Sequence, residues 1–160
     1  PIGYIQHHPP IHKKKSVNKY TADGRAEIHK NLESVDMTIL HILMRNPNMS
    51  ASAEYNDNRI SLYVAQQGKC AVTKERLSLE DIHCHHKLPK SLGGGDDYAN
   101  LKILHERIHR LVHATQEETI SAIMQTVQLD KRQLDKLNKL RKSVGNEAIK
   151  FEQRINPVAD

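Results

Sequence analysis

The chain has 160 residues, with 24 Lys and Arg against 19 Asp and Glu, which gives a formal charge of +5 at pH 7. A hydrophobic content of 38% is enough for an ordinary globular core, and an aromatic content of 4% makes that core aliphatic. The two Cys exclude a disulfide-stapled mini-fold, and no apolar stretch reaches the roughly 20 residues of a membrane-spanning helix.

Residues 1–34 are predicted to form a basic arm and linker. The first 30 residues hold six Lys or Arg and two Asp or Glu, a net charge of +4, and adjacent prolines precede three consecutive lysines. Proline disfavours helix, so we expect the arm to be extended. It is interpreted either as a solvated tail or as a segment that neutralises nucleic-acid phosphates. No signal peptide is visible in the sequence. Because it starts at Pro1 and not at Met, we expect it to be cut from a longer chain or to lack its first residues.

Residues 35–67 are predicted to be a helical region that leads into the rest of the chain and binds DNA. A second helix in this region is expected from residue 58 to Gly68, with Asp57 as its N-cap. The first helix is expected over residues 36–44, with a stripe at helical spacing made of Met37, Leu40, His41 and Met44.

Residues 68–114 have the predicted order strand, glycine loop, strand, helix. The strands are expected at residues 81–86 and 100–103, and three consecutive glycines at residues 93–95 can only form a loop. The helix that follows runs through His113.

Residues 115–160 are predicted to be a helical pair and a disordered tail, which begins at Asn156. Thr115 and Glu118 have the spacing of a capping box for the first helix, and Asp130 is the expected cap of the second, which stops at Gly145.

Histidines are concentrated in one part of the chain, since six of the eleven lie between residues 83 and 113. Imidazole is the commonest metal ligand and also titrates near neutral pH. We therefore expect a metal site or acid–base chemistry in this segment.

The histidine segment resembles the HNH endonucleases with the ββα-metal fold. The resemblance implies an α+β, mostly helical protein whose endonuclease core consists of two short strands, a Gly-rich loop and a helix, packed by flanking helices. It is carried by the motif His85-His86-x-x-Pro89-x-Ser91-x-Gly93-Gly94, followed by Asn100-Leu101 and then His109.

Adjacent residues of a strand point to opposite faces, so His85 and His86 cannot have the same function. The resemblance implies that His86 is the general base and that His85 is a metal ligand. It also implies that Asn100 fixes the loop and orients the His86 ring by a hydrogen bond. His109 resembles the family's helix-borne ligand, and His113 lies four residues later on the same helical face, as in the bacterial colicin DNases.

One divalent metal ion is therefore expected at His85, His109 and His113. Three imidazoles favour Zn²⁺, Ni²⁺ or Mn²⁺. If His113 only caps the helix, water and phosphate oxygens would complete the coordination sphere and Mg²⁺ would fit.

The sequence departs from the structural zinc site of many HNH proteins, which is held by two Cys-x-x-Cys pairs. Thr73 and Ile108 stand at two of the four positions, so only Cys70 and His105 remain as ligands. We expect flanking helices to replace this zinc site. Cys84 is interpreted as a small buried hydrophobic residue.

The flanking sequence resembles the C-terminal end of group II intron reverse transcriptase/maturase proteins over most of the chain. The similar stretches include residues 4–7, 44–47 and 54–63. This resemblance implies that the protein nicks the DNA strand whose new 3′ end primes reverse transcription. Its implied partners are intron RNA and the rest of a reverse transcriptase chain.

The sequence thus predicts a metal-dependent endonuclease that nicks duplex DNA in the bacterial cytoplasm, associated with the nucleoid and not with a membrane. Two alternatives stay open: a stand-alone phage or defence nuclease, and a nucleic-acid-binding module without catalytic activity. The residues predicted to bind DNA phosphates are Lys87, Lys90, Lys102, Arg107 and Arg110.

Overall fold

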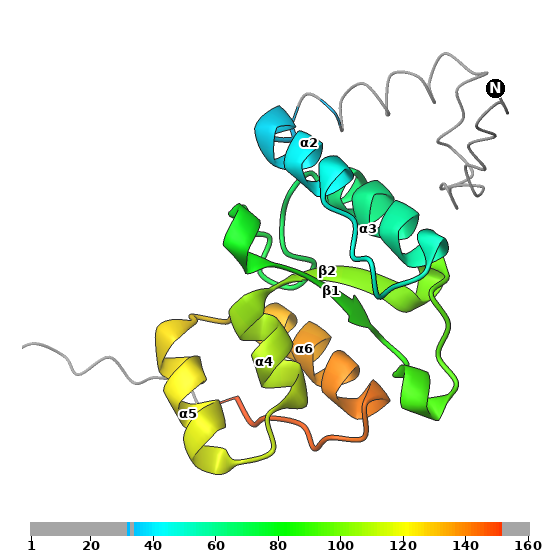
Figure 1. The fold of residues 1–160 in the computed structure, drawn as a ribbon. Helices are drawn as coiled ribbons and strands as arrows, with labels where there is room; N and C mark the ends of the chain where they lie inside the picture. Colours follow the sequence, from blue (N-terminus) through cyan, green and yellow to red (C-terminus); the bar gives the residue numbers. More distant parts are fainter. Residues whose placement is uncertain (1–31, 33, 152–160) are drawn as a thin grey trace, which may run out of the picture.

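The computed structural model describes residue 32 and residues 34–151 of the chain. This described part consists of five α-helices and a two-stranded antiparallel sheet (Figure 1). The protein is therefore α+β and mostly helical, as the sequence predicts. The predicted basic arm, apart from residues 32 and 34, and the predicted tail from Asn156 lie outside the described residues. Within the part of the chain that the structure describes, no helix is both long and apolar enough to cross a bilayer.

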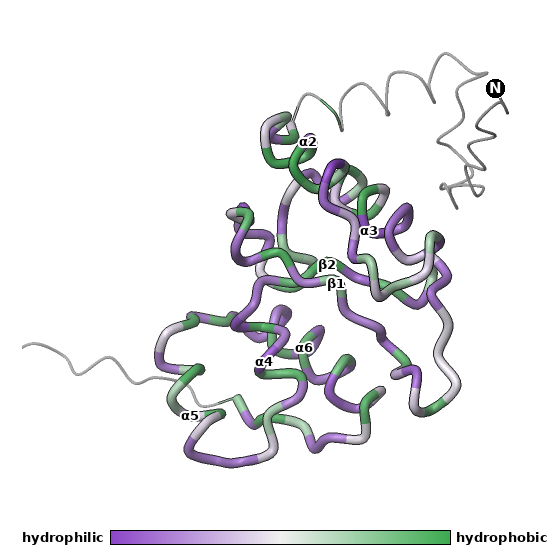
Figure 2. Tube along the Cα trace, in the orientation of Figure 1, coloured by the Kyte–Doolittle hydropathy of each residue, from purple (hydrophilic) through white to green (hydrophobic). Residues whose placement is uncertain are grey.

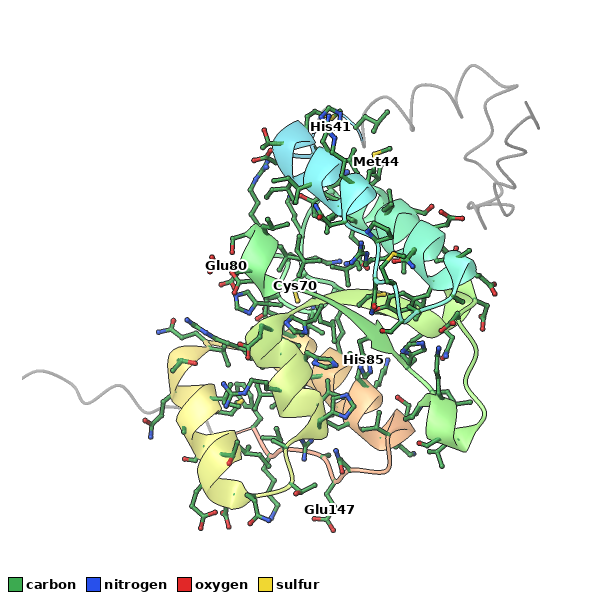
Figure 3. The ribbon with its side chains drawn as sticks, viewed as in Figure 1. His41, Met44, Cys70, Glu80, His85 and Glu147 are labelled. Carbon is green, nitrogen blue, oxygen red and sulfur yellow. The ribbon has the colours of Figure 1, made fainter. Side chains whose placement is uncertain are left out.

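Helix α2 (Met37–Arg45) forms where the sequence predicts a helix, but it buries only Leu40 of the predicted stripe. Leu40 and Leu43 are buried against α3, whereas Met37 and Met44 of the predicted stripe are 47% and 56% exposed. Figure 3 shows His41 and Met44 on the outer side of this helix. Helical spacing by itself allowed either side to face inward, and packing against α3 selected the leucines.

Helix α3 (Ala53–Ala65) begins earlier than predicted, because Ser52 and not Asp57 is its N-cap. The Ser52 hydroxyl accepts a hydrogen bond from the backbone N–H of Tyr55 at 3.0 Å, which satisfies a donor of the first turn. The helix ends before Gln67 and Gly68, whose φ angles of 57° and 66° are left-handed.

The sheet pairs β1 (Ile82–His86) with β2 (Leu101–His105), close to the predicted strands. The register places His83 opposite Leu104 and His85 opposite Lys102. The loop between the strands holds two short 3₁₀ turns, η2 (Lys90–Leu92) and η3 (Tyr98–Asn100), and a third, η1 (Leu79–Asp81), precedes β1. Helices α2 and α3 lie on one side of the sheet and the later helices on the other (Figure 1).

Helix α4 (Glu106–His113) follows β2 directly, and α5 (Glu117–Thr126) and α6 (Lys131–Ser143) complete the fold. The capping box predicted for α5 is wrong, since α5 begins after Gln116 without a side-chain cap. Asp130 is the N-cap of α6, as predicted, and it forms a capping box in which Asp130 and Gln133 exchange hydrogen bonds with each other's backbone.

One aliphatic core joins the sheet to α3, α4 and α6, and apolar residues alternate with polar ones along these helices (Figure 2). Arg141 is 3% exposed and ties α6 to the C-terminal end of α4, because its guanidinium donates to the carbonyls of Leu111 and Ala114. The helices after the second strand are thus part of the same packed body as the sheet. The largest fully buried aliphatic residues are Leu101, Ile103, Leu104, Ile108, Leu111 and Leu137.

Candidate functional site

The pleat of β1 separates the two adjacent histidines of the motif. His83 and His85 share the sheet face that carries Lys102 and Leu104, and His86 lies on the other face with Cys84. The first of these faces meets α4 and the second meets α3. The strand therefore delivers the two imidazoles to two different environments, as the alternation of strand residues predicts.

Three histidines converge on the α4 side of the sheet. The centroid of the His85 ring lies 5.4 Å from that of His109 and 5.2 Å from that of His113, and the last two rings are 4.8 Å apart. One ring nitrogen from each lies within 4.8 Å of the others, which makes this the only cluster of potential metal ligands among the described residues. Figure 3 shows His85 between the strands and α4. We call these three residues the histidine triad.

The local structure accounts for this convergence. His109 and His113 are one helical turn apart on α4, so their side chains lie on the same side of that helix. His105 is both the last residue of β2 and the N-cap of α4, so no loop separates the strand from the helix. The start of α4 therefore lies beside the sheet. His83 stacks on His109 with ring centroids 5.3 Å apart and holds that ring from the outside.

The electrostatics of the triad favour neutral imidazoles. Burial, followed by the neighbouring His109 and His113, lowers the pKa of His85 to about 3. Burial, followed by the neighbouring His113 and His83, lowers the pKa of His109 to about 4. Burial also lowers the pKa of His113. At neutral pH each ring therefore keeps a lone pair, which is the form that binds a metal ion.

One buried atom of the triad has no hydrogen-bond partner. His85 is 2% exposed, and its Nε2 atom is buried and unpaired. A buried polar atom without a partner is unfavourable in a folded protein, and a ligand that accepts the lone pair would remove this penalty. Three neutral imidazoles with one such nitrogen fit a divalent transition metal, which catalytic sites commonly bind with three protein ligands and an open position.

His86 has different surroundings on the α3 side. Its Nε2 lies 2.7 Å from Oδ1 of Asp96, and its ring stacks on Tyr55 with centroids 5.6 Å apart and an interplanar angle of 14°. Neither contact follows from the sequence pattern. The Asp-Asp pair after the glycines was visible in the sequence, but nothing local showed which carboxylate would reach His86.

Asn100 fixes the loop but does not contact His86. Its side chain donates to the carbonyls of Leu88 at 3.0 Å and Gly95 at 2.8 Å, and it accepts from the N–H of Leu88 at 2.8 Å. These bonds use both N–H groups of the amide, and the His86 ring pairs with Asp96, so the predicted hydrogen bond from Asn100 to His86 is wrong. Gly94 lies against the same loop, where an added Cβ would come 1.8 Å from the Leu88 carbonyl oxygen.

The predicted phosphate-binding residues occupy different parts of this region. Lys90 lies 3.0 Å from the Asp96 carboxylate, and Arg110 lies 3.7 Å from Glu106. Arg107 is exposed, and Lys87 directly follows β1. The pKa of Lys102, beside His85 in the sheet, is lowered by burial and then by the charges of Lys87, Lys74 and Lys136. Positive charge is therefore concentrated beside the triad, partly from α6.

Cys70 and His105, the two remaining candidates for a structural zinc site, have other surroundings. Cys70 is fully buried in the aliphatic core. His105 accepts a hydrogen bond from the N–H of Arg107 and lies 3.5 Å from Asp81. Cys84 is partly buried on the His86 face, and burial raises the pKa of its thiol to about 11, so it is protonated at neutral pH.

Comparison with known proteins finds a similarity in the central part of the chain. No curated protein and no solved structure matches the sequence. Residues 69–115 match the family model described as HNH endonuclease. This region holds both strands, the loop with Asn100 and helix α4, so the histidine triad and His86 all lie within the residues that match this family model.

Proposed function

We propose that this protein is a metal-dependent endonuclease that nicks one strand of duplex DNA by hydrolysing a phosphodiester bond. The observation that carries the proposal is the histidine triad, with its neutral rings and its unpaired buried Nε2, in a region that matches HNH endonucleases. An HNH domain indicates a nuclease, and the triad supplies the ligands for the divalent ion that such chemistry uses.

His86 is proposed as the general base. Its Nε2 faces Asp96, which leaves Nδ1 to take a proton from the attacking water. His85, His109 and His113 would hold the ion. When bound, the ion would supply a positive charge that stabilises the negative charge developing on the phosphate and the leaving 3′ oxygen.

The duplex is proposed to bind along the basic surface beside the triad. Lysines and arginines neutralise phosphates without reading sequence, so these contacts would position the DNA and make binding depend on salt. The proximity of Lys102 to three other lysines supports this assignment. The proposed phosphate contacts are Lys87, Lys90, Lys102, Arg107 and Arg110.

The finer assignment, to a group II intron-encoded protein, is also a proposal and rests on the flanking stretches of sequence. In that setting the nick would supply the primer for reverse transcription, and the protein would act in the bacterial cytoplasm beside the nucleoid. A Tyr-x-Asp-Asp polymerase motif in the upstream reading frame would support it. An upstream frame without a polymerase would favour a stand-alone phage or defence nuclease.

A nicking assay tests the activity. Purified protein is incubated with supercoiled plasmid and Mg²⁺, Mn²⁺, Zn²⁺ or Ni²⁺, and the open circular product is measured. His86→Ala should lower the nicking rate by about 10²- to 10⁴-fold, the usual contribution of a general base. His41→Ala is the matched control, because this histidine is exposed on the outer face of α2. DNA binding without cleavage under every metal would show instead a binding module without activity.

A further inference from the structure

We propose that Asp96 is the positioning residue of the general base His86 and that helix α3, which lies outside the HNH match, holds Asp96 in place. The inference rests on the proposed function for its effect on catalysis, and it adds to that function a second layer of residues supplied by the preceding part of the chain. The contacts that carry it involve side chains on three separate segments.

The hydrogen bond between the two residues sets the proton position on the ring. Asp96 Oδ1 lies 2.7 Å from His86 Nε2, and an ionised carboxylate can only accept. Nε2 must therefore carry the proton and donate a hydrogen bond to Asp96, which leaves the lone pair on Nδ1. Asp96 thus determines which nitrogen of His86 is the basic one, as well as the rotation of the ring.

The first turns of α3 fix Asp96 at both its side chain and its backbone. The Ser52 hydroxyl donates to Oδ2 of Asp96 at 2.6 Å while it accepts from the N–H of Tyr55. Asn58, which is 4% exposed, donates from Nδ2 to the Asp96 carbonyl at 2.8 Å. Because the buried Asn58 amide donates to the backbone of Asp96, it holds this residue in a defined position beside His86.

Tyr55 completes the arrangement from the same side of α3. Ser52, Tyr55 and Asn58 are three residues apart in sequence, so they lie along one side of the helix and all reach the segment around His86. The Tyr55 ring stacks on His86, and its hydroxyl donates to the Cys84 carbonyl at 3.4 Å. The imidazole is therefore held by a hydrogen bond at Nε2 and by a ring against its face.

A simple surface ion pair does not explain these contacts. The Lys90 side chain is 56% exposed, so its pair with Asp96 contributes little. The side chains of His86 and Asp96 are 21% and 10% exposed, and Asp96 is shared between the ring and α3. Burial would raise the pKa of Asp96, but the hydrogen bonds from His86, Ser52 and Lys90 outweigh it and lower the pKa to about 2. The residue is thus an ionised acceptor throughout the neutral range.

The first experiment reads the ring directly. Nitrogen-15 NMR of the His86 side chain is recorded on metal-free protein at pH 8, above the ordinary pKa of histidine. The wild type should show the tautomer with the proton on Nε2, and Asp96→Asn should shift the population toward the proton on Nδ1, because an amide can present its NH₂ group to Nε2. A wild-type ring protonated on Nδ1, or an unchanged ring in Asp96→Asn, would overturn the proposal.

The second experiment measures catalysis in the complete chain loaded with metal. Asp96→Asn should lower kcat about 10²-fold, the lower end of what a general base contributes, with KM and metal affinity within twofold of the wild type. In a His86→Ala background the same substitution should have no further effect, because Asp96 acts only through that ring. A further loss in that background would show that Asp96 does something other than position His86.

Asp97→Asn is the matched control. Asp97 carries the neighbouring carboxylate, and it accepts from the backbone N–H of Asn100 at 3.1 Å, a bond that an amide oxygen can keep. It should leave both kcat and the His86 tautomer unchanged. The two experiments also separate the two proposals. A wild type that does not cut DNA would refute the endonuclease, whereas the ring measurement decides on its own whether Asp96 sets the state of His86.

Discussion

The pH dependence of stability should show that the His85 ring is held neutral by the fold. His85 is 2% exposed, and burial with its two histidine neighbours lowers its pKa to about 3 in the folded state. The unfolded chain has the ordinary value of about 6.5. Between these two values the unfolded state binds the additional proton, so the contribution is fully present above about pH 6.5 and is lost as the pH falls toward 3.

The size of this effect follows from the two pKa values. At pH 5 the pH is about 1.5 units below the pKa of the His85 ring in the unfolded chain, so that ring is mostly protonated, while the ring in the folded protein is neutral. At about 1.36 kcal/mol per unit, metal-free protein should lose ~2 kcal/mol of unfolding free energy from His85 between pH 8 and pH 5. The pKa of His109 is lowered to about 4, which adds a loss of the same sign.

Urea unfolding of chelator-treated protein at pH 8 and pH 5 measures this loss. His85→Gln should reduce the difference between the two pH values by ~2 kcal/mol, because glutamine does not titrate. Asp96, with a pKa of about 2, stays ionised at both pH values and does not contribute. His41→Gln, at an exposed histidine, should keep the full wild-type difference. A pH dependence that is identical in His85→Gln and the wild type would refute the reasoning.

Two further substitutions test the frame around the site. Gly94→Ala should distort the loop and lower nicking at least tenfold, because its Cβ would lie 1.8 Å from the Leu88 carbonyl oxygen, and wild-type activity in this variant would contradict the prediction. Gly93→Ala has open space at its Cβ but a φ of 90°, so it should affect stability more than activity. Leu137→Ala on α6 should lower the unfolding free energy by about 2–5 kcal/mol in urea, since this fully buried side chain packs into the core shared with the sheet; a loss below 1 kcal/mol would show that α6 is separable.

Much of the fold could be predicted because its signals are local. The strands, the glycine loop and helix α4 follow from alternation, glycine chemistry and helical spacing, and the Asp130 capping box involves residues three apart in sequence. Two predictions in the helical region before the sheet failed for different reasons. The buried face of α2 was selected by contact with α3, and the start of α3 depended on Ser52, which stands before a first turn without an apolar stripe.

The same division holds for the site. By itself the sequence determined which residues could act, since His109 and His113 must share a side of one helix and His85 and His86 must face opposite ways on a strand. Only the tertiary structure decided what these residues meet. Packing of α4 against the sheet buries His85 and leaves its Nε2 unpaired, and α3 places Asp96 against His86 while Asn100 serves the loop. Desolvation and long-range hydrogen bonds depend on segments far apart in the chain, so no pattern of neighbouring residues could show them.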